Sequence, residues 1–532
     1  MDRREFLLSS AAAGFAARPR ASATPATGRS PAAQSFELDE ITIAQLQEGM
    51  GSGRWTARGI AEQYLARIEA IDRAGPRLNS VIELNPEALA IAEQLDAERK
   101  AKGPRGPLHG IPVLVKDNLD TGDRMQTTAG SLALVGTPAL RDATVVARLR
   151  EAGAVLLGKT NLSEWANYRS TRSTSGWSGR GGLTRNPYVL DRNACGSSSG
   201  SGAAAAANLA AVAIGTETDG SVVCPASICG LVGIKPTVGL VSRAGIIPIS
   251  ATQDTAGPMC RSVADAAAVL WAIHGYDARD PATVPLRQRS FTDWSRELRP
   301  EALRGARLGV ARKGFGLPDS VEPILGEALA ALQRLGAVLI DPAEIPNLGK
   351  LDGPETVVLD YEFKAGLAAY LASRGPRFPV RSLADLIAYN AAQRDRELPW
   401  FGQEIFERAE RRGPLTAAEY RRALASCGRL VRGLGIDALL AQHRLDAVVA
   451  ITAGPSWPSD LVNGDRYTGG CSTPAAVAGY PHVTVPAGLV HGLPIGLSFF
   501  GPAWSEARLI RFAYAYEQET RQRRPPQFLP TL

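Results

Sequence analysis

The middle of the chain, residues 194–227, reads ACGSSSGSGAAAAANLAAVAIGTETDGSVVCPAS. A serine- and glycine-rich start leads into an alanine-rich run that is typical of a helix beginning near Gly200. The apolar run 211–214 is typical of a buried strand, and a turn-forming run then leads to Ser221. Glycine, serine and proline are densest around this stretch, between residues 173 and 255. We therefore look for the functional residues here.

Strand and helix signals alternate along the rest of the chain. Short apolar runs predict strands at 111–115, 154–158, 307–310 and 495–500, and an amphipathic pattern predicts a helix over 323–335. Short apolar strands that alternate with helices are typical of sheets whose faces are covered by helices. The sequence thus predicts an α/β protein with a substantial sheet covered by helices.

The composition is that of a large globular chain, with 532 residues, 45% hydrophobic and 21% charged. The formal net charge is +6, and removal of the first 23 residues, with four arginines and two acidic residues, leaves +4. No block of like charges appears, so we expect no nucleic-acid partner. Beyond the N-terminus no apolar run is long enough to span a bilayer, so we expect no stable membrane association of the mature chain.

The first residues, MDRREFLLSSAAAGFAARPRASATPA, resemble a twin-arginine export signal. Arg3 and Arg4 precede a weakly apolar stretch, and 21–23 forms an A-x-A cleavage site. We expect a signal peptide at 1–23, a linker rich in proline, alanine, serine and threonine at 24–38, and export to the periplasm or the medium. The alternative is a disordered basic tail.

The six cysteines form no CxxC pair, and the five histidines are scattered without metal spacing. We therefore expect neither a metal nor a cofactor. An exported protein could pair some of its cysteines. For Cys195 and Cys224, which flank the serine-rich regions, the favoured interpretation is small packed thiols.

Two serine stretches could supply a nucleophile. Residues 196–200, GSSSG, match the G-x-S-x-G elbow of α/β-hydrolases with Ser198 as the nucleophile. The elbow needs a preceding strand, whereas the residues before Gly196 are polar and turn-like. In the second stretch, the N–H groups of residues 218–221 could converge beside Ser221 and stabilise an oxyanion. Spacing alone equally fits an ordinary loop that leaves a strand.

A serine nucleophile needs a base, and no histidine lies near either stretch. Lysine can act as the base when burial lowers its pKa. Lys116 directly follows the apolar run 111–115, and Lys159 follows the run 154–158 in the same way. Sequence logic by itself does not choose between these two lysines.

Several segments resemble, in order, the motifs of the amidase signature family: PLHGIPVLVKDN, GSSSGSGAAAAA, GTETDGSVVCPA, GIKPTVGLVS, QDTAGPM, AGYPHVTVPAG and GLPIGLSFFG. The resemblance covers nearly the whole mature chain. It implies a single large mixed β-sheet covered on both faces by helices, in one catalytic domain at 39–532. The core motifs fall in 107–260 and 446–502, and a variable segment spans about 290–445.

The resemblance also implies a Ser-cisSer-Lys triad. By motif match Lys116 is the base, Ser197 is the serine after a cis peptide bond and relays protons, and Ser221 is the nucleophile. The backbone N–H groups of Thr218, Asp219, Gly220 and Ser221 would form the oxyanion hole. Under this interpretation Lys159 is structural, and we expect Ser198, Ser199 and Ser201 to cap the alanine-rich helix.

The loop departs from the family's common DTGGS at one position, because Asp219 stands where glycine is usual. The Asp219 side chain must point away from the oxyanion, which it would otherwise repel. With KTNLSEWAN, SGWSGRGG and CGSSSGSG, this version is similar to the bacterial peptide amidases of the family, which deamidate C-terminal peptide amides. Residues 359–367, Trp165 and Trp177 are candidates for the pocket wall, although core packing fits them as well.

Other functions stay open. The substrates could instead be small aliphatic or aryl amides or esters, since the triad suits all of them. The chain could also be an amidotransferase A-type subunit of a cytoplasmic complex, against which the export signal argues. A non-catalytic binding protein would not need an intact triad, and an esterase would use Ser198. We expect a monomer or a homodimer.

Overall fold

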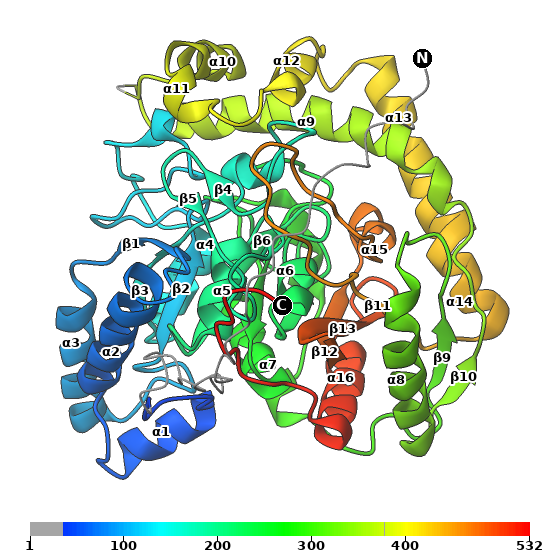
Figure 1. The fold of residues 1–532 in the computed structure, drawn as a ribbon, viewed down its shortest axis with the longest axis horizontal. Coiled ribbons are helices and arrows are strands. Elements are labelled where there is room, and N and C mark those ends of the chain that lie inside the picture. The colour runs from blue at the N-terminus through cyan, green and yellow to red at the C-terminus, as the bar shows by residue number, and fades with distance from the viewer. Residues whose placement is uncertain (1–35, 377) are drawn as a thin grey trace, which may run out of the picture.

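The computed structural model describes residues 36–376 and 378–532 (Figure 1). The predicted signal peptide and most of the linker lie outside the described residues. One sheet of 11 strands crosses the molecule in the order β1-β3-β2-β6-β8-β7-β12-β13-β11-β9-β10, and β4 and β5 form a small hairpin. The strands are β1 Val81–Leu84, β2 Pro112–Lys116, β3 Val155–Thr160, β4 Trp177–Ser178, β5 Gly182–Leu183, β6 Val212–Glu217, β7 Val232–Lys235, β8 Thr255–Cys260, β9 Arg307–Val310, β10 Val338–Ile340, β11 Ala447–Ile451, β12 His482–Val490 and β13 Leu493–Phe500.

The sheet is mixed. Strands β3, β2 and β6 run parallel at one end, β11, β9 and β10 run parallel at the other, and the strands between them are antiparallel. The helices are α1 Ile43–Gly51, α2 Ala57–Arg67, α3 Ala88–Lys102, α4 Thr144–Glu151, α5 Ser199–Ala206, α6 Val223–Ile228, α7 Val263–Ile273, α8 Glu322–Arg334, α9 Asp352–Ser373, α10 Leu383–Ala392, α11 Arg394–Glu397, α12 Glu404–Glu410, α13 Ala418–Gly428, α14 Asp437–His443, α15 Thr473–Ala478 and α16 Glu506–Thr520.

Helices cover both faces of the sheet, and the strand glycines show how closely they pack. On one face α6 lies against Gly233 of β7, where an added Cβ would come within 2.7 Å of the Ala226 Cβ. On the other face α8 lies against Gly488 of β12, where an added Cβ would meet Ile324 at 2.8 Å. Helices α7 and α16 pack together with α8 on that second face. The prediction of a large mixed sheet covered on both faces is confirmed.

The part of the variable segment from α9 to α13 forms a helical layer at one end of the molecule, where α9 runs along the top of Figure 1 with α10, α11, α12 and α13 beside it. Its apolar side chains, among them Phe363, Leu367 and Phe406, make a separate core that also takes in Trp165. Buried Asp360 of α9 accepts hydrogen bonds from Arg408, Arg412 and Tyr168. This layer is thereby fixed to the loops that precede the serine-rich stretch.

Most predicted strands are present with shifts of a residue or two. The strand at 211–214 is longer than predicted, because β6 continues through Thr216 and Glu217, which the sequence pattern placed in the turn. Pairing with β8 extends it, since Thr216 and Glu217 lie opposite Ala256 and Thr255. The extension matters because it aims Thr216 at the candidate site.

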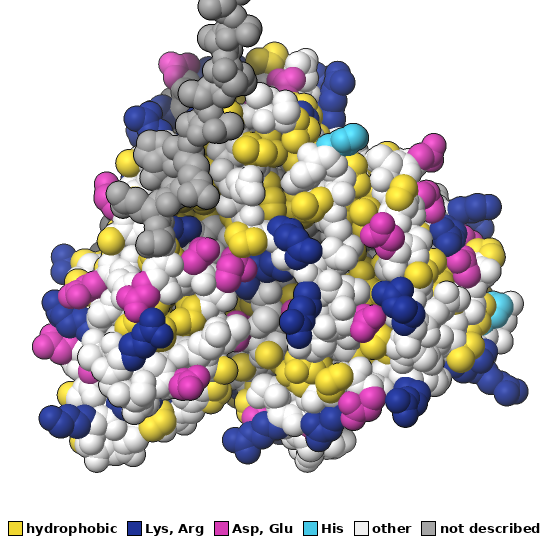
Figure 2. All heavy atoms as spheres, turned by 60° about the horizontal axis from the view of Figure 1, so that its bottom comes forward, with side chains coloured by type: hydrophobic (Ala, Val, Ile, Leu, Met, Phe, Trp, Pro, Cys, Tyr) yellow, Lys and Arg dark blue, Asp and Glu magenta, His cyan; other side chains and the backbone are white. Residues whose placement is uncertain are grey.

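The described part of the chain contains no helix long and apolar enough to cross a membrane. On the face drawn in Figure 2, basic and acidic side chains are interspersed.

Candidate active site

Lys116 is the last residue of β2, the third strand from one edge of the sheet, and its side chain is fully buried. Its Nζ lies 2.8 Å from Ser197 Oγ, 2.9 Å from Thr216 Oγ1 and 3.3 Å from Thr216 O. Burial lowers the pKa of Lys116 to about 7, although the negative charges of Asp254 and Glu217 partly oppose the shift. A substantial fraction of this amine is therefore neutral near pH 7 and able to accept a proton.

Ser197 follows a cis peptide bond to Gly196, as the family resemblance implies. Its carbonyl accepts the N–H of Ser163 at 3.0 Å, so the loop before α5 is attached to the segment after β3. The next residue, Ser198, donates its N–H to the carbonyl of Ser221 at 3.3 Å. The two serine stretches, 24 positions apart in sequence, thus meet in one place.

Ser221 lies between the end of β6 and the start of α6, and 8% of its surface is exposed. Gly220 before it has a φ of +78°, and a Cβ there would come within 2.9 Å of Ser472 Oγ. Only glycine combines this φ with so close a neighbour without strain. In the described part of the chain, no hydrogen bond joins the hydroxyls of Ser197 and Ser221.

The loop before Ser221 presents free hydrogen-bond donors. Among the described residues, the backbone N–H groups of Thr218, Asp219, Gly220 and Ser221 have no hydrogen-bond partner. Four successive backbone N–H groups without a protein partner, in the turn between a strand and a helix, can converge on an anion or a carbonyl oxygen. The N–H groups that follow are in use, because Val222 and Val223 donate to Glu217 Oε2.

The Asp219 side chain is held by the start of α15. Its two carboxylate oxygens accept hydrogen bonds from Ser472 Oγ at 2.5 Å and Thr473 Oγ1 at 2.6 Å. Thr218 Oγ1 donates to Asp254 at 2.6 Å. Both polar side chains of the loop therefore have partners outside it, while its amide groups stay free.

The remaining serine hydroxyls do not cap α5, so that prediction was wrong. Ser198 is the residue before the helix, but its Oγ donates to Thr216 O at 3.0 Å and accepts the Thr216 N–H at 3.2 Å. Ser201 Oγ donates to Ile214 O at 3.0 Å, and Ser199 Oγ donates to Cys195 O. The helix is fully buried, so its hydroxyls bond to the backbone of neighbouring segments, chiefly β6.

Lys159 is buried like Lys116 but lies apart from the serines. Its Nζ donates to Leu119 O at 2.6 Å and to Thr127 Oγ1 at 2.9 Å. Residue pattern alone left Lys116 and Lys159 as equal candidates for the base. The structure places Lys116 against Ser197.

A cavity of about 430 Å³ opens over the two serine loops. Gly196 and Gly220, the residues before the two candidate serines, lie in its wall together with Asp219. The loop between β11 and α15 contributes Trp457, Asp465 and Tyr467, which sequence reasoning missed. The sequence does contain a sign of this pocket loop. Two turn-rich segments, GPSWPSD and GDRYTGG, each with one aromatic residue, lie between a strand and a helix.

The other candidates for the pocket wall lie elsewhere. Trp165 is 1% exposed and packs edge-on against Phe406, and Trp177 is buried against Phe401. Residues 359–367 belong to α9 and do not line this cavity. These aromatic residues are core residues, the alternative that the sequence had left open.

Cys195 and Cys224 form a disulfide with a Cα–Cα distance of 6.3 Å, so the favoured interpretation as packed thiols was wrong. Cys195 stands two residues before Ser197, and Cys224 stands three residues after Ser221. Both also line the cavity. The bond arises because two stretches distant in sequence are folded against each other, which spacing does not reveal.

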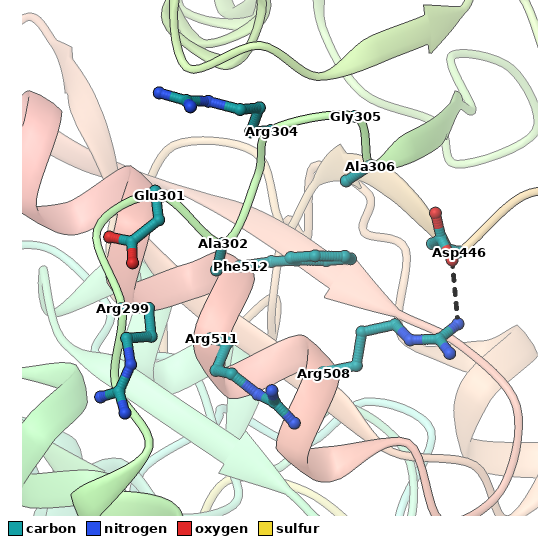
Figure 3. A pocket seen from close by; sticks show the side chains of 10 residues that line it. All are labelled: Arg299, Glu301, Ala302, Arg304, Gly305, Ala306, Asp446, Arg508, Arg511 and Phe512. Atoms are coloured by element: carbon teal, nitrogen blue, oxygen red, sulfur yellow. Dashed lines mark hydrogen bonds and ion pairs between the residues drawn. The ribbon is translucent and has the colours of Figure 1, made fainter.

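A second hollow of about 560 Å³ lies between residues 299–306 and α16 (Figure 3). Arg299, Arg304, Arg508 and Arg511 line it, but their guanidinium groups point in different directions in Figure 3, and Arg508 pairs with Asp446 at 3.1 Å. It contains none of the predicted site residues. Within residues 36–376 and 378–532 no group of three metal-ligating side chains could hold a metal ion.

Similarity to known proteins extends over most of the chain. The family model described as Amidase matches residues 60–510. A probable amidase of Arabidopsis thaliana is 44% identical over 505 residues, which cover 93% of each chain. The solved native peptide amidase of Stenotrophomonas maltophilia is 54% identical with a TM-score of 0.89, over 93% of this chain and 100% of that chain.

The A-type subunit of a glutamyl-tRNA(Gln) amidotransferase from Halorhodospira halophila is also similar, at 36% identity over 504 residues, with 91% of this chain and 98% of the relative covered. In each case the likeness extends over most of the chain, and the residues that the family model matches include Lys116, Ser197 and Ser221. The chain therefore belongs to the amidase family.

Proposed function

We propose that the protein is a serine amidohydrolase that converts a carboxamide into a carboxylate and ammonia through an acyl-enzyme on Ser221. C-terminal peptide amides are the proposed substrates. One observation carries the proposal: the buried Lys116 amine lies 2.8 Å from Ser197 Oγ, on a loop that contacts the Ser221 segment with its four unpartnered amide groups. Acyl transfer of this kind requires a nucleophile, a base and an oxyanion site, and here Ser197 is placed to relay protons to the base.

In the first half-reaction Ser221 Oγ attacks the carbonyl carbon of the amide. Its proton moves to Ser197 Oγ, and the Ser197 proton moves to neutral Lys116, which becomes an ammonium. The carbonyl oxygen takes up the negative charge and is stabilised by the N–H groups of residues 218–221. The C–N bond then breaks, and the same relay returns a proton to the departing nitrogen, so that ammonia leaves.

In the second half-reaction water takes the place of the amine. Its proton passes through Ser197 to Lys116 as its oxygen attacks the acyl carbon. Collapse of the tetrahedral intermediate breaks the ester bond, and the relay returns the proton to Ser221 Oγ. Thr216 orients the base throughout, because its Oγ1 and carbonyl oxygen accept N–H bonds and leave the nitrogen lone pair for Ser197.

The peptide-amide substrate class is supported by 54% identity to a solved peptide amidase over its whole length. The alternatives are small aliphatic or aryl amides and esters. A further alternative is an amidotransferase A-type subunit. The similarity to the A-type subunit of a glutamyl-tRNA(Gln) amidotransferase supports this alternative.

Export by the twin-arginine route to the periplasm or the medium completes the proposal, with the protein acting as a monomer or homodimer. The Cys195–Cys224 disulfide supports it, since disulfides persist in oxidising compartments. Replacing Arg3 and Arg4 together by lysine should leave the protein in the cytoplasm, as fractionation would measure. Export of that variant at the normal level would contradict this route.

The deciding experiment is ammonia release by the purified mature protein from a blocked dipeptide amide, with acetamide and benzamide in parallel. We expect preference for the peptide amide, no turnover by Ser221→Ala, a loss of several orders of magnitude in Lys116→Ala and residual activity in Ser197→Ala. Wild-type-like activity in Ser221→Ala or Lys116→Ala would contradict the mechanism with Ser221 as the nucleophile and Lys116 as the base. Full activity in Ser198→Ala would eliminate the esterase-like arrangement. Turnover only in the presence of a partner subunit would favour the amidotransferase.

A further inference from the structure

The cavity above Ser221 has an acidic lining. Of the described residues in its wall, two are acidic, Asp219 and Asp465, and none is a lysine, arginine or histidine. Asp465 is engaged by three groups, because its carboxylate accepts hydrogen bonds from Ser175 N, Trp457 Nε1 and Asn193 Nδ2. Asp219 accepts only two hydroxyl hydrogen bonds and retains partial exposure in the cavity.

Both carboxylate oxygens of Asp219 accept hydroxyl hydrogen bonds, as the oxygens of an ionised carboxylate do. Burial raises the pKa of Asp219, but the hydrogen bonds from Ser472 and Thr473 oppose the shift, because each stabilises the carboxylate. Burial and the charge of Asp219 together raise the pKa of Glu355 to about 8. The charge of Lys235 also favours ionised Asp219, although burial lowers the pKa of Lys235 to about 8.

Ser472 and Thr473 hold the Asp219 carboxylate at the cavity wall. Only Gly220 separates Asp219 from Ser221, and Ser472 Oγ, which donates to Asp219, lies where a Gly220 side chain would be. A partly buried charge acts on a neighbouring charge more strongly than a fully solvated one does. A substrate side chain placed in this cavity therefore meets a fixed negative charge.

We propose that Asp219 determines the charge specificity of the enzyme, so that amides with neutral or cationic side chains beside the scissile bond are accepted and acidic ones are rejected. This inference rests on the proposed function and deepens it. It gives Asp219, at the position where the family loop commonly has glycine, a role as a specificity residue.

The test uses N-acetylated dipeptide amides that differ only in the last residue: glutamine, glutamate, methionine and lysine. kcat/KM is measured at pH 8 and low ionic strength. The wild type should prefer the glutamine amide to the glutamate amide at least about tenfold and accept the lysine amide at least as well as the methionine amide. Higher ionic strength should weaken the discrimination, because salt screens a partly exposed charge.

The Asp219→Asn and Asp219→Gly variants should lose most of the glutamine-to-glutamate discrimination, by at least about fivefold. Asp465→Asn is the matched control, because it removes from the same cavity wall a carboxylate that already accepts hydrogen bonds from three donors. This variant should retain more of the glutamine-to-glutamate discrimination than the Asp219 variants do. An unchanged ratio in both folded Asp219 variants would overturn the proposal.

A second measurement does not depend on turnover. Calorimetry in the Ser221→Ala background compares binding of the glutamine and glutamate amides with and without Asp219→Asn. The difference in affinity should shrink when Asp219 is replaced, and an unchanged difference would again overturn the proposal. Failure of the proposed function would look different, because no amide would then be hydrolysed by the wild type.

Discussion

At the scale of single residues, Lys116 decides the chemistry. A lysine with its ordinary pKa would be protonated at neutral pH and useless as a base. Full burial inside the sheet lowers the pKa of Lys116 to about 7, because an apolar environment disfavours the ammonium. The same burial brings Thr216 and Ser197 within hydrogen-bond distance, so one placement provides both the basicity and the geometry.

The pH dependence of kcat/KM should follow this lysine. We expect activity to be low when the amine is protonated, to rise with pH through an apparent pKa of about 7, and to level off above it. Because the Asp254 carboxylate holds the pKa of Lys116 up, Asp254→Asn should move the rise to lower pH. Initial rates from weakly acidic to weakly basic pH with a neutral amide measure both effects. A flat profile across that range would contradict Lys116 as the base.

Thr216 is the residue that orients this base. Its Oγ1 accepts from Lys116 Nζ at 2.9 Å and from Asn118 Nδ2 at 2.9 Å. Thr216→Val keeps the shape and removes the acceptor, so we expect about a tenfold fall in kcat with little change in KM, equivalent to about 1.4 kcal/mol. Thr216→Ser, which keeps the hydroxyl, is the control. Equal losses in both variants would mean that only packing matters.

At the scale of elements, the active site depends on segments that are distant in sequence. Strand β2 supplies Lys116, the loop before α5 supplies Ser197, and the connection from β6 to α6 supplies Ser221. The Cys195–Cys224 disulfide ties the second and third of these segments together over a separation of 29 residues. The bond therefore limits how far the two serine loops can move apart.

Removing the disulfide should weaken this arrangement. The double variant Cys195→Ala/Cys224→Ala should lose about 3 kcal/mol of unfolding free energy, as expected for a loop of this size, and should lose activity as well. Differential scanning calorimetry and ammonia release measure the two effects. Reductant should destabilise the wild type but leave the double variant unchanged. If all the cysteines of the denatured, unreduced wild type reacted as free thiols, the bond itself would be contradicted.

At the scale of the whole molecule, the two ends of the described chain meet against the central helices. Arg523, beyond α16, donates to both oxygens of Glu40, which precedes α1, each at 2.7 Å. The same guanidinium donates to Ala206 O at the end of α5 and to Gly230 O after α6. One side chain thus links the N-terminal and C-terminal segments to the two helices that border the site.

Arg523→Ala should therefore destabilise the whole fold. We expect a loss of about 2–3 kcal/mol, because the Glu40 carboxylate keeps only the hydrogen bond from Asn208 and two carbonyl groups lose the Arg523 donor. Burial by itself would raise the pKa of Glu40, but the hydrogen bonds and charge of Arg523 outweigh it, so the pKa is lowered in the folded protein. The stability that ionised Glu40 contributes is thus fully present at pH values above 4.5, the usual pKa of a glutamate. It is lost as the pH falls through the lowered pKa of the folded protein.

Thermal unfolding of wild type and variant at neutral pH and at a pH below the usual range of a glutamate measures this loss. The difference between the two proteins should be smaller at the acidic pH, where Glu40 is protonated in both. An equal difference at both pH values would contradict the link between Arg523 and Glu40.

Much of the architecture could be predicted because it depends on local pattern. The strand at 307–310 has the predicted bounds, and the strands at 111–115 and 495–500 differ from the prediction by only a residue or two. Short apolar runs between turns are typical of buried strands, which is why these predictions succeed. The end of β6 was misplaced because Thr216 and Glu217 have turn-like sequence neighbours, and only their pairing with β8 keeps them extended. The capping role of Ser198 was misassigned for a similar reason, since the nearby strand offered better partners.

The sequence by itself determined the α/β class and the family motifs, because both are local patterns, and the resemblance to the family implied Lys116, Ser197 and Ser221. Residue pattern without that resemblance left Lys116 and Lys159 equal, and the tertiary structure places Lys116 against Ser197, 81 positions away in sequence. It also decided the Cys195–Cys224 bond and the part that residues 454–470 play in the pocket wall. Such contacts depend on the order of strands in the sheet, which no periodicity along the chain encodes.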